Sequence, residues 1–336
     1  MDNLTHSLTG VMLSRAGLDR LYPRATLLLL LASNVPDADI VTRLGGSLLY
    51  LDYHRHLTHA LVAVPLMALP CVLVMRAVER RATEFPWMRA LLVSIIGVLV
   101  HLTLDLWNNY GVRLLLPFSS DWFSLDAVMV IDPWLWLVLG LAIAAPALAR
   151  LVGSEIASAN QKTRGRGWAV FALLFILFWV GGRMILHNRA VEILKARNYQ
   201  GEAPLRVAAW PTPFNPLRWI GYISTESAWS LHDVRIGKGF DPEAGRVYHK
   251  PSDATRINAA KRTDEVRRFL QFARYPVWRL VPVTEPDGGV AVEGVDVRFG
   301  RPEERRFMVQ VVLDKELRVV SSRFEFGNIS LEGQDD

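Results

Sequence analysis

The long apolar segments of the first 187 residues are the feature that most constrains this chain. Six can be marked, at residues 4–18, 24–41, 57–75, 88–107, 128–152 and 167–186. A helix needs about 20 apolar residues to cross the roughly 30 Å hydrocarbon core of a bilayer. The last four segments reach that length, whereas the first is short and the second is interrupted by Pro36. The pattern predicts an all-α polytopic membrane helix bundle of about five or six spans over residues 1–187.

The rest of the chain, residues 188–336, reads as a soluble α+β domain. Alternating segments at residues 290–299, 307–314 and 317–326 predict three strands. Residues 253–274 predict a basic amphipathic helix, and the stretch 204–235 is typical of a strand that leaves a Pro-rich turn. His232 and His249 are isolated, and we expect them on the surface or in loops. The domain could cover a membrane site, select a substrate or bind a partner.

The distribution of lysine and arginine predicts the topology. If the chain crosses six times, one side receives eleven basic residues: Arg15, Arg20, Arg24, Arg76, Arg80, Arg81, Arg89, Arg150, Lys162, Arg164 and Arg166. The other side receives three: Arg43, Arg55 and Arg113. Cytoplasmic loops carry the excess of positive charge. We therefore expect a multi-pass membrane protein whose C-terminal domain is extracytoplasmic.

The same topology brings histidines and aspartates from five segments to one level of the outer face. These residues are His6, Asp37, Asp39, His54, His56, His59, His101, Asp105, Asp126 and Asp132. Ionisable groups at membrane depth are costly, and they are usually paired, metal-bound or turned to a water-filled cavity. His101 and Asp105 are four residues apart and share one helix face. The convergence predicts a polar site in the core of the bundle.

Histidine and aspartate together are typical ligands of zinc or a similar divalent ion. The number of such residues permits one or two ions. A carboxylate that binds no metal, with Asp39 and Asp126 as candidates, could act as a general base. Arg55 and Arg113 lie on the same face and could bind an anionic group of a substrate. Cys71 is the single cysteine, which excludes a multi-cysteine zinc site and an intrachain disulfide.

Several of these residues also have a simpler interpretation. His6 could be an ordinary polar residue near the N-terminus, and His56 a solvated histidine at the interface. Asp37 and Asp126 could cap helix ends, and the two arginines could contact lipid phosphates. His59, His101 and Asp105 are the hardest to explain in this way, because each lies within or against a span.

Several stretches in order resemble a known family of bacterial inner-membrane proteins, identified as membrane-bound, metal-dependent hydrolases and reported to be under SOS-repressor control. They are MDNLTHSLTG at the start, NVPDAD at 34–39, YHRHLTHA at 53–60, HLTLDLWNNYG at 101–111, RLLLPFS at 113–119 and SLDAVMVIDPW at 124–134. The resemblance covers roughly residues 1–140. It places ligand-type positions on His6, Asp37, Asp39, His54, His59, His101, Asp105, Asp126 and Asp132. One departure is His56, which stands where the family usually has glycine.

The His-and-Asp pattern is also similar, more weakly, to that of zinc-dependent phospholipase C and related nucleases. Together the two resemblances imply an integral membrane, metal-dependent hydrolase, in which a metal-activated water attacks a phosphoester or ester of an amphiphilic or lipid-linked substrate. The expected partners are membrane lipids. We expect no nucleic-acid partner, since the net charge of +5 is modest and forms no basic stripe. The alternative is a non-catalytic membrane protein whose His/Asp cluster carries or senses metal ions or protons, and a purely structural or regulatory role also stays open.

Overall fold

The first half of the chain is a bundle of apolar helices. The structure is a computed structural model that describes residues 1–153 and 164–326. The helices are α1 (Asn3–Ala16), α2 (Ala25–Ala32), α3 (Ser47–Tyr53), α4 (Val64–Val78), α5 (Trp87–Trp107), α6 (Pro133–Gly153) and α7 (Arg164–Lys195). In the described part of the chain, four segments are long and apolar enough to cross a membrane: Ala25–Gly45, Leu61–Val78, Trp87–Trp107 and Gly165–Lys195. The predicted membrane helix bundle is confirmed, with Pro133–Leu148 as a shorter apolar helix.

Three of the predicted segments are less regular than their apolar composition indicates. α2 ends at Ala32 and is followed by a 3-10 helix, Val35–Gly45, which has Pro36 in its first turn. Proline cannot donate to the preceding turn, and it therefore favours a break in the α-helix. Two short 3-10 turns precede α4, and residues 128–132 precede α6 without forming part of it. All three irregular stretches lie at the end of the bundle that carries the polar site.

Small residues allow the helices to approach closely beside that site. α2, α4 and α5 share one apolar core, whereas α1, α6 and α7 share another. A Cβ atom built on Gly97 of α5 would lie 2.8 Å from the Cβ of Ala32 and 3.1 Å from Leu29. Glycine at such a contact lets two membrane helices pack backbone against backbone. Gly97 is one turn before His101, so this contact fixes α5 against the end of α2.

The second half of the chain forms two antiparallel sheets of four strands each. The first sheet contains β1 (Arg206–Pro211), β2 (Arg218–Ser224), β3 (Ala228–Arg235) and β4 (Arg246–His249) in that order. The second contains β5 (Pro276–Pro282), β6 (Val290–Asp296), β7 (Phe307–Leu313) and β8 (Val319–Phe326). This confirms the predicted helical bundle followed by a domain of strands and helices.

Some details of this domain differ from the sequence predictions. The predicted helix over 253–274 is two helices, α8 (Ala254–Ala260) and α9 (Asp264–Phe272), because residues 261–263 form a turn between them. His232 was expected at the surface but is 4% exposed on β3, where its Nε2 lies 2.8 Å from the Oγ of Ser230. Burial lowers the pKa of His232 to about 4. His249 is exposed at the end of β4, as expected.

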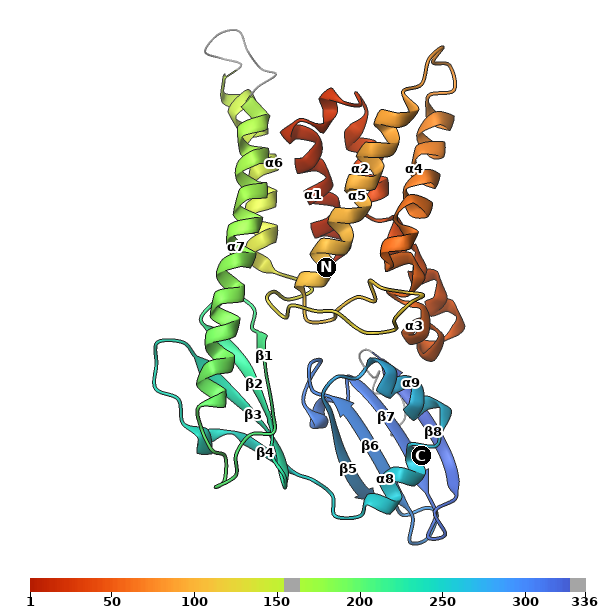
Figure 1. The fold of residues 1–336 in the computed structure, drawn as a ribbon, viewed down its shortest axis with the longest axis vertical. Helices are drawn as coiled ribbons and strands as arrows, with labels where there is room; N and C mark the ends of the chain where they lie inside the picture. Colours follow the sequence, from red (N-terminus) through yellow and green to blue (C-terminus); the bar gives the residue numbers. More distant parts are fainter. Residues whose placement is uncertain (154–163, 327–336) are drawn as a thin grey trace.

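α7 joins the bundle to the first sheet as one continuous helix (Figure 1). Its 32 residues reach about 48 Å, which is more than a bilayer core requires. Ala190 and Leu194 near its end pack against Trp219 and Ile223 of the first sheet. The predicted boundary after residue 187 therefore falls within a helix. Lys162 of the topology count, and residues 327–336 of the predicted domain, lie outside the described residues.

The loop between α5 and α6, residues 108–132, lies between the bundle and the two sheets (Figure 1). Several side chains of the C-terminal domain bind it. Arg298 donates to the carbonyl oxygens of Asn109 and Tyr110, and Arg274 forms an ion pair with Asp126 at 2.7 Å. The loop starts three residues after Asp105. The C-terminal domain is thus attached directly to the chain that leaves the polar site.

Candidate metal centre

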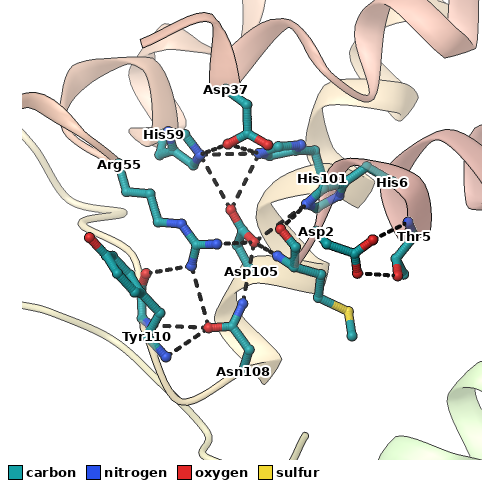
Figure 2. A network of polar contacts seen from close by, with 12 residues as sticks. Asp2, Thr5, His6, Asp37, Arg55, His59, His101, Asp105, Asn108 and Tyr110 are labelled. Atoms are coloured by element: carbon teal, nitrogen blue, oxygen red, sulfur yellow. Dashed lines mark hydrogen bonds and ion pairs between the residues drawn. The ribbon is translucent and has the colours of Figure 1, made fainter. Parts of the chain in front are cut away.

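Four buried ligand-type side chains from three segments meet at the end of the bundle (Figure 2). Asp37 comes from the 3-10 helix after α2, and His59 from the short turn before α4. His101 and Asp105 come from the last turns of α5. The side chains of His59, His101 and Asp105 are fully buried, and that of Asp37 is 9% exposed. The four residues were all predicted from the sequence.

The donor atoms of this group lie close together. The Nε2 atoms of His59 and His101 are 3.1 Å apart. Asp105 Oδ2 lies 3.3 Å from each of these nitrogens. Asp37 Oδ1 lies 3.4 Å from the nitrogen of His59 and 3.6 Å from that of His101. Five of the six separations among the four atoms therefore fall between 3.1 and 3.6 Å.

The hydrogen bonds of the two imidazoles determine which nitrogen is free. His101 Nδ1 lies 2.7 Å from the carbonyl oxygen of Ser33, and a carbonyl can only accept, so Nδ1 carries the proton. His59 Nδ1 donates to the hydroxyl of Thr58 at 3.0 Å, and that hydroxyl donates to Asp39 Oδ2 at 2.9 Å. Both Nε2 atoms therefore present lone pairs to the centre. A partner that fixes the tautomer in this way is typical of metal-binding histidines.

The resulting group contains two nitrogen lone pairs and two carboxylate oxygens, and these are all acceptors. Asp105 Oδ2 is buried without a hydrogen-bond partner among the described residues. Facing acceptors in a buried site repel one another, and a cation removes that repulsion. A tetrahedron with edges of about 3.3 Å has its centre about 2.0 Å from each corner, which matches zinc–nitrogen and zinc–oxygen bonds. The donor set fits a four-coordinate divalent ion.

The other oxygen of Asp105 is held by neighbouring donors. Asp105 Oδ1 accepts from Arg55 Nη2 at 2.9 Å and from Asn108 Nδ2 at 3.3 Å, and it also contacts the amino nitrogen of Met1. The Arg55 guanidinium donates to the carbonyl oxygen of Gly111 at 3.0 Å and stacks over the ring of Tyr110. These contacts turn Oδ2 toward the two histidines.

A second group shares Asp37 with the first. The ligand atoms of Asp37, Asp39 and His54 lie within 4.8 Å of one another. Asp39 Oδ1 accepts from His54 Nδ1 at 2.9 Å, and Asp39 Oδ2 accepts from the backbone N–H of Arg55 at 2.8 Å. Burial lowers the pKa of His54, which favours the neutral imidazole that metal binding requires. The side chain of His54 is 12% exposed, so this group is closer to solvent than the first.

Three of the residues predicted as metal ligands or catalytic groups have other partners. His6 is stacked on the ring of His101, with centroids 3.9 Å apart, and its Nε2 donates to the carbonyl oxygen of Met1. Asp126 is paired with Arg274 and with the hydroxyl of Ser124. Asp132 accepts hydrogen bonds from the backbone N–H groups of residues 134 and 135, and it thereby caps the N-terminus of α6. The structure brings none of the three into either ligand group.

Arg55 also differs from its predicted role. It is 3% exposed and bound to Asp105, so it positions a ligand and is not free to bind the anionic group of a substrate. Arg113 and His56 lie outside both ligand groups and line a hollow on the surface. Sequence reasoning missed Ser33, Thr58 and Asn108, which orient the ligands. Asn108 could have been predicted, because it stands three residues after Asp105 in the stretch HLTLDLWNNYG that resembles the family.

The bundle on the far side of the centre is filled with apolar side chains. Leu28, Leu29, Ala32, Val93 and Val98 belong to one buried apolar core. The close contact of Gly97 with Ala32 lies in the same region. Within residues 1–153 and 164–326, the centre therefore abuts closely packed apolar residues on that side, whereas the polar loops lie on the side of the C-terminal domain (Figure 1).

Comparisons with known proteins agree with this description. Residues 1–190 match the family described as YdjM inner membrane protein, and residues 255–330 match the YfhP C-terminal alpha/beta plait domain. The protein named "Uncharacterized protein YfhP" from Bacillus subtilis (strain 168) is 28% identical over 336 residues, which cover 96% of this chain and 94% of that protein. No solved structure matches the chain. Since the first match spans more than half of the sequence, the chain belongs to the YdjM inner membrane protein family.

Proposed function

We propose that the protein is an integral membrane, metal-dependent hydrolase with two adjacent ion positions. The observation that supports this most is that Asp37 belongs to both ligand groups. The first group offers four protein donors, which is typical of a closed position, whereas the second offers three and leaves room for water. A carboxylate shared by two neighbouring ions is expected in two-metal hydrolytic sites.

The residues around the second position have defined tasks in this proposal. An ion held by Asp37, Asp39 and His54 would lower the pKa of a bound water to about 7, which supplies a nucleophile at neutral pH. Asp39 also accepts hydrogen bonds from the backbone N–H of Arg55 and from the hydroxyl of Thr58, and these bonds hold its carboxylate in one orientation. Arg55 offsets the charge of Asp105 inside the bundle. Zinc suits these ligands, and manganese or iron would also be accepted.

An amphiphilic phosphoester or ester, free or lipid-linked, is the substrate class that we propose. A mostly apolar groove of about 290 Å³ lies between the end of α2 and α4. Leu31, Val35 and Val74 line it, and Val35 is two residues before Asp37. An acyl chain in this groove would bring a polar group at its end near the second ion position. This arrangement would give access from the lipid side of the bundle.

The alternative, a carrier of metal ions or protons, requires a polar path to the other end of the bundle. The tightly packed apolar side chains beyond His101, with Gly97 against Ala32, oppose such a path. A hydrolase needs access from one side only. The packing therefore favours the hydrolase over the carrier.

The test is to load the purified protein with zinc or manganese and compare it with His54→Ala. We expect two equivalents of metal in the parent protein and one in the variant. We expect the variant to lose at least about a hundredfold in the rate of hydrolysis of short-chain phospholipids and chromogenic phosphodiesters, since it lacks a ligand of the open position. His249→Ala, an exposed histidine on β4, is the matched control. No hydrolysis by the fully loaded parent protein, or equal hydrolysis by His54→Ala, would contradict the proposal.

We also propose that the metal centre and the C-terminal domain lie outside the cytoplasm, because the basic residues gather at the opposite end of the bundle. The check uses a Cys71→Ser background with Ser252→Cys, an exposed position before α8. We expect a membrane-impermeant maleimide to label intact spheroplasts at this residue. Labelling that requires lysis of the membrane would reverse the orientation.

A further inference from the structure

A polar hollow of about 440 Å³ lies where α9 of the C-terminal domain meets the loop after α3. Its charged lining consists of Asp52, His56, Arg113, Asp264, Arg267 and Arg268. The hollow is separate from the metal centre, since none of these residues belongs to either ligand group. Both sites nevertheless use the same loops: Arg55 and His56 are neighbours, and Arg113 follows Gly111 by two residues.

The two carboxylates of the hollow already have partners. Arg268 Nη1 lies 2.7 Å from Asp52, and Arg268 Nε lies 2.7 Å from Asp264. Arg267 adds a further contact to Asp264 at 3.2 Å. The pairs leave the lining with more positive than negative charge. An anion would therefore enter a positive field.

Arg113 is the unusual member of this lining. It is only 8% exposed, and its Nε is buried without a hydrogen-bond partner among the described residues. The guanidinium stacks over the ring of Trp122 at 4.7 Å, and Trp122 is held by its own N–H, which donates to the carbonyl oxygen of Gln271. A buried N–H without an acceptor is costly, and an anion that entered the hollow would supply an acceptor. His56 Nδ1, in the same lining, is likewise buried and unpartnered within the described chain.

Exposed apolar side chains lie in the lining of the hollow or close to it in the sequence. Tyr53 lines it and is 50% exposed, Leu57 follows His56 and is 52% exposed, and Phe118, five residues after Arg113, is 85% exposed. The two stretches are joined by the hydrogen bond from the N–H of Leu61 to the carbonyl oxygen of Leu114. Apolar side chains beside buried basic groups are typical of a surface that contacts lipid head groups.

We propose that Arg113, Arg267 and His56 form a binding site for a phosphate group at the membrane surface. The planar guanidinium of Arg113 matches phosphate oxygens with two parallel hydrogen bonds, and Trp122 holds its plane. The phosphate could belong to a membrane phospholipid or be free in solution, and the exposed apolar side chains favour the phospholipid. The proposal does not depend on the metal centre being catalytic.

The test measures binding to the full-length protein in detergent by calorimetry, with dihexanoyl phosphatidic acid, inorganic phosphate and phosphate-free dihexanoyl glycerol as probes. We expect phosphatidic acid to bind to the parent protein. Its dissociation constant should rise at least about tenfold in Arg113→Gln, since glutamine has neither the positive charge nor the parallel N–H groups of the guanidinium. The matched control is Arg206→Gln, because Arg206 also stacks on a ring, that of Tyr275, but is exposed elsewhere in the domain. It should leave the dissociation constant unchanged.

The outcomes distinguish the two sources of phosphate. Binding of phosphatidic acid alone would identify a phospholipid site, whereas equal binding of inorganic phosphate would identify a site for the free ion, and both would support the proposal. If Arg113→Gln does not fold, Arg267→Gln on the exposed face of α9 is used, with an expected loss of about threefold. No binding of either phosphate probe to the parent protein, binding of the glycerol as tight as that of phosphatidic acid, or binding unchanged in the variants, would overturn the proposal.

Discussion

Replacing His101 with glutamine should weaken metal binding by at least about a hundredfold. His101 presents an unprotonated Nε2 to the centre because its Nδ1 donates to the carbonyl oxygen of Ser33. Glutamine preserves size and polarity but has no imidazole lone pair. Losing a partner that only orients a ligand already costs about 10–100-fold in metal affinity, so losing the ligand should cost more. Competition with a fluorescent chelator at fixed pH measures the dissociation constant.

The control for this experiment is His249→Gln, since His249 is exposed on β4 and far along the chain from the ligands. It should bind metal like the parent protein. Circular dichroism before metal addition establishes that both variants are folded. An equal dissociation constant for His101→Gln and the parent protein would remove His101 from the metal centre.

Replacing Arg298 with methionine should lower the free energy of unfolding by about 3–5 kcal/mol. The side chains of Arg298 and Asp296 are fully buried and joined at 2.7 Å. Arg298 also donates to the carbonyl oxygens of Asn109, Tyr110 and Phe272. Methionine leaves a buried carboxylate without its partner, which is the costly way to break a buried ion pair. Denaturant unfolding followed by tryptophan fluorescence measures the change.

The same substitution should also weaken metal binding, by about tenfold. Arg298 holds the backbone of Asn109 and Tyr110, and the neighbouring Asn108 donates to Asp105 Oδ1. A looser loop orients Asp105 less well, as expected for an outer-shell contact. Arg318→Met, at an exposed position before β8, should change neither quantity. A stable Arg298→Met protein with normal metal affinity would show that the C-terminal domain does not support the centre.

The buried ligands of the metal centre could be predicted from the sequence, whereas the partners of Asp126 and Asp132 could not. His59, His101 and Asp105 lie within or against apolar segments, where a charge without a partner is expensive, so their meeting could be expected. Asp126 and Asp132 lie in the loop between α5 and α6, where a carboxylate can bind nearby N–H groups or an arginine. Whether it does so depends on backbone direction, such as the positive φ of 49° at Asp126. Segment order alone does not contain that information.

The fold was predictable to a similar degree. Long apolar runs fix the helices of the bundle because length and composition decide them locally. The strands of the first sheet were hard to predict from the sequence. β1 and β2 contain Pro211 and Gly221, and they depend on pairing with neighbouring strands. Gly221 leaves room there for Leu194 of α7, since a Cβ would lie 2.7 Å from the end of that side chain. Such a contact joins residues 27 positions apart, and no local pattern signals it.

The most direct measurement is the metal content of the detergent-purified parent protein beside Asp105→Asn, by elemental analysis after incubation with zinc and manganese. We expect two equivalents per chain in the parent protein and a loss of at least one in the variant, because Asp105 Oδ2 faces the two histidines. No metal in the parent protein, or the same amount in both proteins, would contradict the assignment of this cluster as a metal centre.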